Sequence, residues 1–386
     1  MSFPEAGRLC RFGALLAAAA PAALFPGESA AQSRLSLDAE AEQTVASNPF
    51  LIPGDDKATA IVEVLARPAI AWTLGPGTSL DLAGAIGARQ YHRRFGNYVI
   101  GRADATFRHR ANEYFSLMGA VSYARELPVD GFGDSIDAAF DTLSIRNSYV
   151  ARTMASWNPD AMTSIVGDLS LQRTSHPSST ILPPTTYRNV RIGFSRRASP
   201  VTNVGFATHL TLGDSGTGGE STAKGLELTV ARRLASDWRA DAQVGVERLS
   251  MRGGLPGRDM GSTNISGGAN FCYEPSRTVL CLSGALRSAL SGIGGLQREL
   301  SFTGSLNRRL SERGTLTAAA DYRRSRLPAL DVRVDVLRLG TAYEHRLTDR
   351  LSLTGGVDYL RRTRLSGESI GGAFVKLGIT VRGLGR

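Results

Sequence analysis

Apolar and polar side chains alternate with a period of two along most of this chain, and the pattern is clearest over residues 336–362. This stretch contains two alternating runs separated by a turn at Thr348-Asp349. Its apolar face is formed by Leu337, Leu339, Tyr343, Leu351, Leu353, Val357 and Tyr359. A period of two is typical of β-strands, so the stretch predicts a hairpin. Each arm has the roughly ten residues that a tilted strand needs to cross a bilayer.

The same pattern recurs along the chain. Further strands are predicted over 34–44, 58–74, 79–91, 97–109, 114–126, 224–234, 238–249 and 373–381, with another hairpin over 298–323. The alternation weakens through 140–173 but still supports two strands there. The predicted fold class is therefore all-β, a transmembrane up-and-down antiparallel β-barrel of about eighteen strands, or sixteen if the weak region is merged. A periplasmic β-propeller is the alternative, although its blades should lack long strands that are charged along one whole face.

Two kinds of connection alternate between these strands. Short turns are predicted at 75–77, 110–113, 235–237, 311–313 and 348–349. Longer loops are predicted at 45–57, 127–139, 174–186, 213–223 and 250–262. Outer-membrane barrels have short periplasmic turns and longer external loops, so the long segments are expected outside the cell.

The beginning of the chain resembles a secretory leader. Arg8 and Arg11 precede the apolar run 13–25, and Ser29-Ala30-Ala31 provides the small residues that a signal peptidase reads. Residues 1–31 are therefore predicted to be a cleaved signal peptide, and residues 32–386 the barrel domain. The predicted location is the outer membrane of a Gram-negative bacterium. Lipid and lipopolysaccharide would then be its surroundings, and the barrel assembly machinery its partner during biogenesis.

The net charge of +10 comes almost wholly from arginine. A basic chain can bind nucleic acid, but an exported barrel without a nucleic-acid motif makes that partner unexpected. No serine elbow or phosphate-binding loop is present, and the histidines are scattered without metal-ligand spacing at 92, 109, 176, 209 and 345. Isolated histidines of this kind are expected to be solvated. We therefore expect no enzyme, no catalytic residue, no metal and no cofactor.

The mature chain resembles the outer-membrane proteins grouped as β-barrel porin type 2, which accompany exopolysaccharide export systems of Gram-negative bacteria. The residues that carry the resemblance are LDAEAEQTVASNPF near the first strand, the meander with Ser/Thr-Asp/Glu-Arg turns, and the segment 270–296. It implies a barrel that acts as a conduit or accessory factor in exopolysaccharide export, with polysaccharide and export-machinery proteins as partners. The last residues, Gly-Leu-Gly-Arg, depart from the terminal aromatic residue that such barrels commonly carry.

The alternation also predicts which charged side chains face the lumen. The lumen candidates are Arg102, Arg108, Arg239, Arg309, Arg323, Arg338, Arg346, Lys376 and Arg382. Arginine binds carboxylates with two parallel hydrogen bonds, so such a surface would suit an anionic glycan. Alternatively, these cations pair with interleaved acids such as Asp104 and Glu344 and only hold the wall in shape.

Two further functions are left open by the sequence. One is a general diffusion porin for small solutes, and the other is a surface protein that binds partners through its external loops.

A disulfide between Cys272 and Cys281 is also predicted, because these are the only cysteines after the leader and an exported chain meets an oxidising compartment.

Overall fold

A computed structural model describes residues 32–55, 57–131, 136–216, 219–252, 260–291, 295–327, 332–363 and 366–383. The predicted leader, residues 1–31, lies outside this range. The strands are β1 (Gln32–Ser47), β2 (Ala58–Gly75), β3 (Thr78–Tyr91), β4 (Asn97–Arg110), β5 (Phe115–Glu126), β6 (Arg146–Trp157), β7 (Thr163–Ser175), β8 (Thr185–Ser199), β9 (Thr202–Ser215), β10 (Gly219–Arg233), β11 (Trp238–Arg252), β12 (Met260–Tyr273), β13 (Thr278–Ser291), β14 (Gly295–Arg309), β15 (Gly314–Leu327), β16 (Val332–Arg346), β17 (Leu351–Thr363) and β18 (Ser369–Val381).

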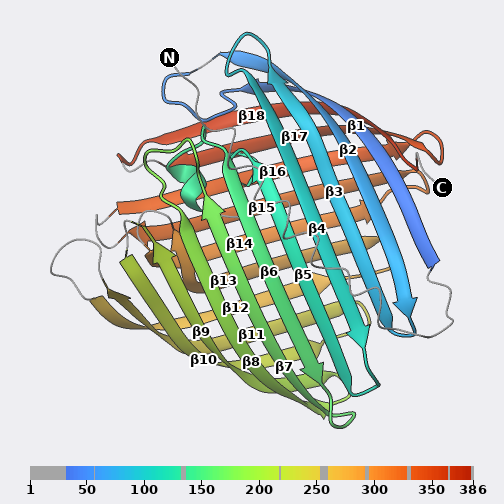
Figure 1. Ribbon diagram of the computed structural model, residues 1–386, viewed down its shortest axis with the longest axis vertical. Coiled ribbons are helices and arrows are strands. Elements are labelled where there is room, and N and C mark those ends of the chain that lie inside the picture. The colour runs from blue at the N-terminus through green and yellow to red at the C-terminus, as the bar shows by residue number, and fades with distance from the viewer. Residues whose placement is uncertain are drawn as a thin grey trace, which may run out of the picture.

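The strands form one 18-stranded antiparallel sheet that closes on itself, because β1 pairs with both β2 and β18. Each strand pairs with its neighbours in the chain, which is the up-and-down order predicted from the alternation. The weak region does contain two strands, β6 and β7, so the count is eighteen and not sixteen. Figure 1 shows β2 to β6 crossing over the opposite wall of β14 to β18, with the short helix η2 (Ile136–Ala139) between them.

The outer face of the wall is apolar. Several side chains that were predicted to point outward are more than half exposed, namely Val64, Val121, Leu228, Val244 and Val375. Ile86 and Leu282, which were not assigned to a face, are exposed to the same extent. A water-soluble protein rarely exposes apolar surface over so wide an area, whereas a lipid-facing barrel must. Among the described residues, no helix is long and apolar enough to span a bilayer.

The connections at the two ends of the barrel differ, as predicted. At one end, called here the short-turn end, the strands are joined by tight turns such as 76–77 and 310–313. The loops 48–57, 127–145 and 176–184 lie at the other end, called here the long-loop end. The loop predicted at 213–223 is shorter than expected, because β9 continues to Ser215 and β10 begins at Gly219. A polar strand can still pair where it projects beyond lipid. For the loop predicted at 250–262, β11 continues to Arg252 and β12 begins at Met260, and residues 253–259 lie outside the described residues.

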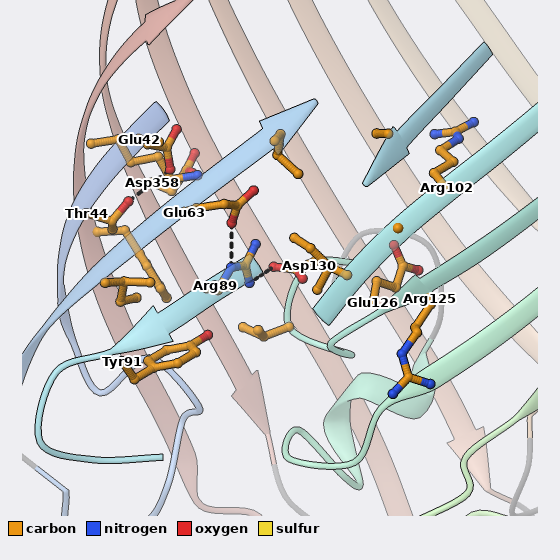
Figure 2. A pocket seen from close by; sticks show the side chains of 18 of the residues that line it. Glu42, Thr44, Glu63, Arg89, Tyr91, Arg102, Arg125, Glu126, Asp130 and Asp358 are labelled. Carbon is orange, nitrogen blue, oxygen red and sulfur yellow. Dashed lines mark hydrogen bonds and ion pairs between the residues drawn. The ribbon is translucent and has the colours of Figure 1, made fainter. Parts of the chain in front are cut away.

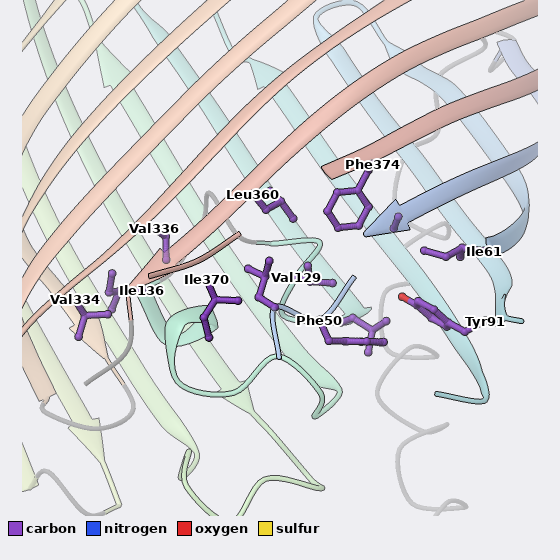
Figure 3. Packing of buried hydrophobic residues seen from close by; sticks show 13 residues of the cluster. Phe50, Ile61, Tyr91, Val129, Ile136, Val334, Val336, Leu360, Ile370 and Phe374 are labelled. Carbon is purple, nitrogen blue, oxygen red and sulfur yellow. The ribbon is translucent and has the colours of Figure 1, made fainter. Parts of the chain in front are cut away.

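The loops predicted at 45–57 and 127–139, observed as 48–57 and 127–145, lie at the long-loop end but do not project away from the barrel as expected. Both loops fold into the barrel, where Phe50, Leu51, Leu127, Val129 and Ile136 are buried. They pack against side chains on the inner faces of β2, β3 and β16 to β18, namely Ile61, Tyr91, Val334, Val336, Leu360, Ile370 and Phe374 (Figure 3). These apolar loop residues would meet water outside the cell, so burial inside the barrel is favourable. The result is a hydrophobic cluster within the lumen.

Candidate functional site: the narrowed lumen

The loop 48–57 is held inside the barrel by its own hydrogen bonds and by hydrogen bonds from Arg362 and Thr142. Asn48 accepts a hydrogen bond from the Ile52 amide at 2.7 Å and donates one to the Ile52 carbonyl at 2.8 Å. Leu51 has a φ of 51°, a left-handed conformation that is uncommon for a leucine. Its carbonyl accepts a hydrogen bond from Arg362 at 2.9 Å. A backbone in this region persists when its surroundings fix it, so the loop is built into the lumen.

The loop 127–145 crosses the lumen from β5 and β6 towards the opposite wall. Thr142 donates a hydrogen bond to the Phe50 carbonyl at 2.6 Å and so ties the two inward loops together. Near its middle, Asp137 on η2 accepts a hydrogen bond from Ser291 at the end of β13, at 2.8 Å. The helix also lies against β15 and β16. The loop therefore bridges the barrel.

A third element enters the lumen from the facing wall. We call residues 287–291 and 295–299, the described part of the end of the β13–β14 hairpin, the hairpin tip. Leu296 of the tip is 1% exposed and lies in a small cluster with Ala223 and Leu249, on the inner faces of β10 and β11. The Leu296 amide donates to the Ser221 hydroxyl at 3.2 Å. Together, the tip and the two loops narrow the lumen at the long-loop end.

A charged cavity of about 290 Å³ lies beside the loop 127–145. At its centre, Arg89 of β3 binds Glu63 of β2 at 2.5 Å and Asp130 of the loop at 2.7 Å (Figure 2). Arg338 on β16 donates to the Asp130 carbonyl at 3.5 Å. Only about one seventh of the Arg89 side chain is exposed, so its ion pairs are screened less than surface pairs. The cavity wall and the loop are thus joined by charge as well as by apolar packing.

A second cavity, of about 430 Å³, lies between η2 and the hairpin tip. Arg323 of β15 binds Glu299 of the tip at 2.9 Å. Arg146 donates to Glu126 at 3.0 Å, next to the loop. Arg102 and Glu126 line both cavities, so the two spaces adjoin across the loop. The narrow zone is consequently lined by arginines and carboxylates in close alternation.

The nine cations predicted for the lumen fall into two groups. Arg102, Arg323, Arg338 and Lys376 line the cavities of the narrow zone or the adjoining space. The other five lie at or just beyond the ends of their strands at the short-turn end, namely Arg108, Arg239, Arg309, Arg346 and Arg382. The predicted set is therefore divided along the barrel axis and does not form one continuous surface.

Most of these cations contact a carboxylate. In the narrow zone Lys376 binds Asp358 at 2.8 Å, and Arg102 binds Asp104 at 2.7 Å. At the short-turn end the ion pairs are Arg108–Asp81, Arg239–Asp241, Arg239–Glu274 and Arg382–Glu344. Arg346 donates to the Glu312 carbonyl at 3.3 Å. This geometry is that of the second interpretation given above, in which the charges pair across strands.

Several functional residues were missed from the sequence. Glu63 and Arg89 lie on inner faces that the alternation of β2 and β3 specifies, so they could have been included. Asp130 and Asp137 could not have been found by this route, because they reach the lumen through a loop that was expected outside. Ser291 and Glu299 were also missed. Ser291 lies in the segment 270–296, to which no strand faces were assigned, and Glu299 lies in the hairpin 298–323, where only Arg309 and Arg323 were named as lumen candidates.

Two histidines are not solvated as expected. His209 on β9 lies 3.1 Å from Glu247 and 3.9 Å from Glu227, and little of its side chain is exposed. His176 follows β7 and is 5% exposed. Burial lowers the pKa of His176, although Asp137 and Asp141 partly oppose this effect. In the described part of the chain, the one group of three potential metal ligands is Cys272, Glu274 and Cys281, and both of its sulfurs are in a disulfide.

The predicted disulfide between Cys272 and Cys281 is present. The two residues are directly opposed on β12 and β13, with their Cα atoms 4.2 Å apart. They lie at the short-turn end of this strand pair, on the face that points into the barrel together with Asn270, which donates to Asp241 at 3.3 Å. The bond therefore joins β12 and β13 at the short-turn end. At the opposite end of β13, the hairpin tip enters the lumen.

No protein-family model matches this chain, and neither does any curated protein sequence. Solved structures with a similar fold include OccK2 (OpdF) of Pseudomonas aeruginosa in complex with glucuronate, which is 12% identical with a TM-score of 0.48 and covers 91% of this chain and 98% of its own. OpdQ of the same organism is 9% identical with a TM-score of 0.48, and the match covers 91% of this chain and 98% of OpdQ. OccAB3 of Acinetobacter baumannii is 8% identical with a TM-score of 0.46, and the match covers 91% of this chain and 99% of OccAB3. At these identities the likeness concerns the fold alone, and the resemblance to exopolysaccharide-associated porins stays a prediction.

Proposed function

We propose that this protein is an outer-membrane diffusion porin for small solutes, the alternative to exopolysaccharide export that was left open above. The observation that carries the proposal is the narrowing of an otherwise wide barrel by two inward loops and the hairpin tip. Barrels of sixteen to eighteen strands leave an aqueous channel unless something fills it. Here the fill is partial, because charged cavities flank the loop 127–145.

The size of the cavities disfavours a polysaccharide conduit. Spaces of about 290 and 430 Å³ suit small molecules, since typical small-ligand pockets measure roughly 300 to 1,000 Å³. A polymer would have to displace the loop 127–145, which is fixed at Thr142, Asp137 and Asp130. A role as a surface protein that binds through its external loops has less support, because two of the long loops turn inward.

The ionic preference of the pore should be weak and towards anions. The cavity beside Arg89 is lined by five cations and five carboxylates, and the cavity beside the hairpin tip by four arginines and three carboxylates. The small excess of cations gives a slight positive potential. Most of these side chains are paired, so they hold the wall in shape and leave weak contacts for solutes, which conduction requires.

Planar-bilayer recording with a potassium chloride gradient tests this proposal. The wild-type pore should conduct with a small preference for chloride. The double variant Arg102→Glu/Arg338→Glu reverses two charges in the narrow zone and should shift the reversal potential towards potassium. The matched control Arg309→Glu/Arg346→Glu reverses two charges at the wide short-turn end, where salt screens them more, and should cause a smaller shift. A wild-type protein that inserts as a folded barrel but does not conduct would refute the porin.

The location follows from the outer surface. An apolar band around a closed barrel has no other stable solvent than lipid. We propose that the barrel sits in the outer membrane with lipopolysaccharide around it, and that the barrel assembly machinery inserts it. The folded protein should then migrate differently in boiled and unboiled samples on a mild detergent gel. Recovery in the soluble periplasmic fraction would contradict this location.

A further inference from the structure

The wall of the barrel is incomplete between β12 and β13 at the long-loop end. These strands pair from Tyr273↔Leu280 to Gly267↔Leu286, and the described residues beyond this point, 260–266 on β12 and 287–291 on β13, do not pair with one another. On its other side, the tip also leaves its neighbour, because pairing between β14 and β15 begins at Glu299↔Ser325. Residues 287–291 of β13 and 295–298 of β14 are therefore paired with each other but not with the neighbouring strands of the wall.

The side of the tip that would face lipid packs inside the barrel instead. Ser288 lies on the same face of β13 as Leu282, which is 54% exposed, yet its hydroxyl donates to Glu247 on the inner face of β11. Leu296 lies on the same face of β14 as the exposed Phe302, yet it contacts the inner faces of β10 and β11. The described strands of the tip, still paired with each other, thus lie inside the barrel against β10 and β11.

The vacated edge of β12 is poorly compensated. Arg298 of the tip donates to the Ile265 carbonyl at 3.2 Å, so a side chain replaces one backbone partner. The Ser266 hydroxyl and the Gln297 amide nitrogen are buried without a hydrogen-bond partner. Buried polar groups without a partner are unfavourable, which lowers the advantage of the lumen position.

The sequence of the tip is equally suited to the wall. Its alternation continues that of β13 and β14, with Leu286, Leu296 and Leu300 on the lipid side and Arg287, Gln297 and Glu299 on the lumen side. Extending the observed register would place Ala289 opposite Asn264, in the same kind of directly opposed pair as Cys272 and Cys281. Gly267 and Gly268 lie where the strands separate, and glycine tolerates a bend in a strand.

We propose that the hairpin tip is a gate, which exchanges between the observed position in the lumen and a position in the wall, paired with β12 and β15. In the lumen position the tip meets the loop 127–145 through Ser291 and Asp137, and it narrows the pore. In the wall position this hydrogen bond is broken, the second cavity widens and the pore opens. The disulfide between Cys272 and Cys281 keeps the base of the β12–β13 pair closed in both positions.

Two engineered disulfides test the gate. Ser221→Cys/Leu296→Cys should join in the observed position, because the Ser221 hydroxyl already contacts the Leu296 amide. Asn264→Cys/Ala289→Cys should join only when the tip is in the wall. Both proteins are made in the full chain and oxidised in liposomes, and peptide mass spectrometry identifies the joined residues. Single-cysteine variants control for damage, and wild type under the same reductant shows what loss of Cys272–Cys281 does by itself.

We expect both disulfides to form, the first leaving conductance at the wild-type level and the second raising it severalfold until reductant is added. Failure of the 264–289 pair to form while the 221–296 pair forms would overturn the gate. A 264–289 disulfide that leaves conductance unchanged would also overturn it, because the tip would then move without controlling the pore. The conductance readout rests on the proposed porin function, whereas cross-linking does not, so a pore that never conducts would refute the porin alone.

Discussion

Two strand pairs of this barrel show how differently one wall can be held together. β1 pairs with β2 along its whole length, from Gln32↔Thr73 to Ser47↔Ala58, and it pairs with β18 on the other side to close the barrel. β12 pairs with β13 over half of its length and has a disulfide at the end that stays closed. The first seam, β1 with β2 and β18, has continuous backbone pairing and an ion pair between Arg67 and Glu40 at 2.6 Å. The second seam, β12 with β13, has fewer backbone pairs and a covalent bond.

The two strand pairs also differ in what lies behind them in the lumen. Behind β1 to β3 and β16 to β18 the lumen contains the apolar cluster around Phe50 and Phe374, which supports the wall from within. Behind β12 and β13 lies the tip, whose contacts are the polar side chains of Ser288 and Ser291 and a small apolar cluster at Leu296. A well-packed interior favours one arrangement, whereas polar contacts of modest strength allow two.

The largest expected effect comes from placing a charge on the outside of the closed seam. Val375 on β18 is 59% exposed and pairs with Val45 and Val357 near the middle of the wall. Val375→Arg should lower the free energy of unfolding in lipid by about 2 to 4 kcal/mol, because arginine is costly at the bilayer midplane. Denaturant titration of the barrel in liposomes measures this loss.

Thr263→Arg is the matched variant on the unpaired end of β12. Thr263 is exposed and lies beyond the last apolar outward residue of that strand, Ile265. Its loss should be about 0 to 1 kcal/mol, as expected near a membrane interface. Equal losses at Val375 and Thr263 would show that the two residues lie at the same depth in the membrane, contrary to this interpretation.

The next effect concerns the covalent bond. The double variant Cys272→Ser/Cys281→Ser should lose about 2 to 3 kcal/mol of stability by the loop-entropy model. Because few backbone pairs remain between β12 and β13, the damage should concentrate there. Hydrogen exchange at residues 267–273 should rise more than at residues 34–46 of β1. Uniform exchange along both strands would contradict a special need for the bond in this seam.

The smallest effect is a pH dependence at His176. Burial lowers its pKa in the folded protein, while the unfolded value is near 6.5. The folded state therefore favours neutral His176, and this stability is complete above about pH 6.5 and is lost as the pH falls towards the lowered pKa. The loss is at most about 1.4 kcal/mol for each pH unit in that window. The facing charged groups are Asp137, Asp141 and Arg146.

Unfolding midpoints measured between pH 7.5 and pH 5 test this effect. His176→Phe should flatten the slope, and the control His92→Gln, which alters an exposed histidine, should leave it unchanged. The same slope in the wild type and in His176→Phe would assign the pH dependence to other groups.

The alternation of side chains was sufficient to predict the wall, because each strand reports its lipid-facing side directly. The structure has Arg323, Arg338 and Lys376 of the predicted lumen set beside cavities inside the barrel. The alternation did not predict the inward loops, since Phe50 and Val129 lie outside any periodic run, and burial is decided by partners far away in sequence. It could not predict the tip, because Leu296 continues a lipid-facing pattern while its side chain packs inside the barrel.

We propose above all that the lumen is narrow enough to pass small solutes and to exclude polysaccharide chains. Swelling of liposomes that contain the wild-type protein, measured with sugars from monosaccharide to long oligosaccharide, tests it most directly. We expect entry of monosaccharides and a steep fall in rate as the sugar lengthens, because the cavities beside the loop 127–145 limit passage. Rapid entry of long oligosaccharides, at rates close to those of monosaccharides, would contradict the account and favour a wide conduit.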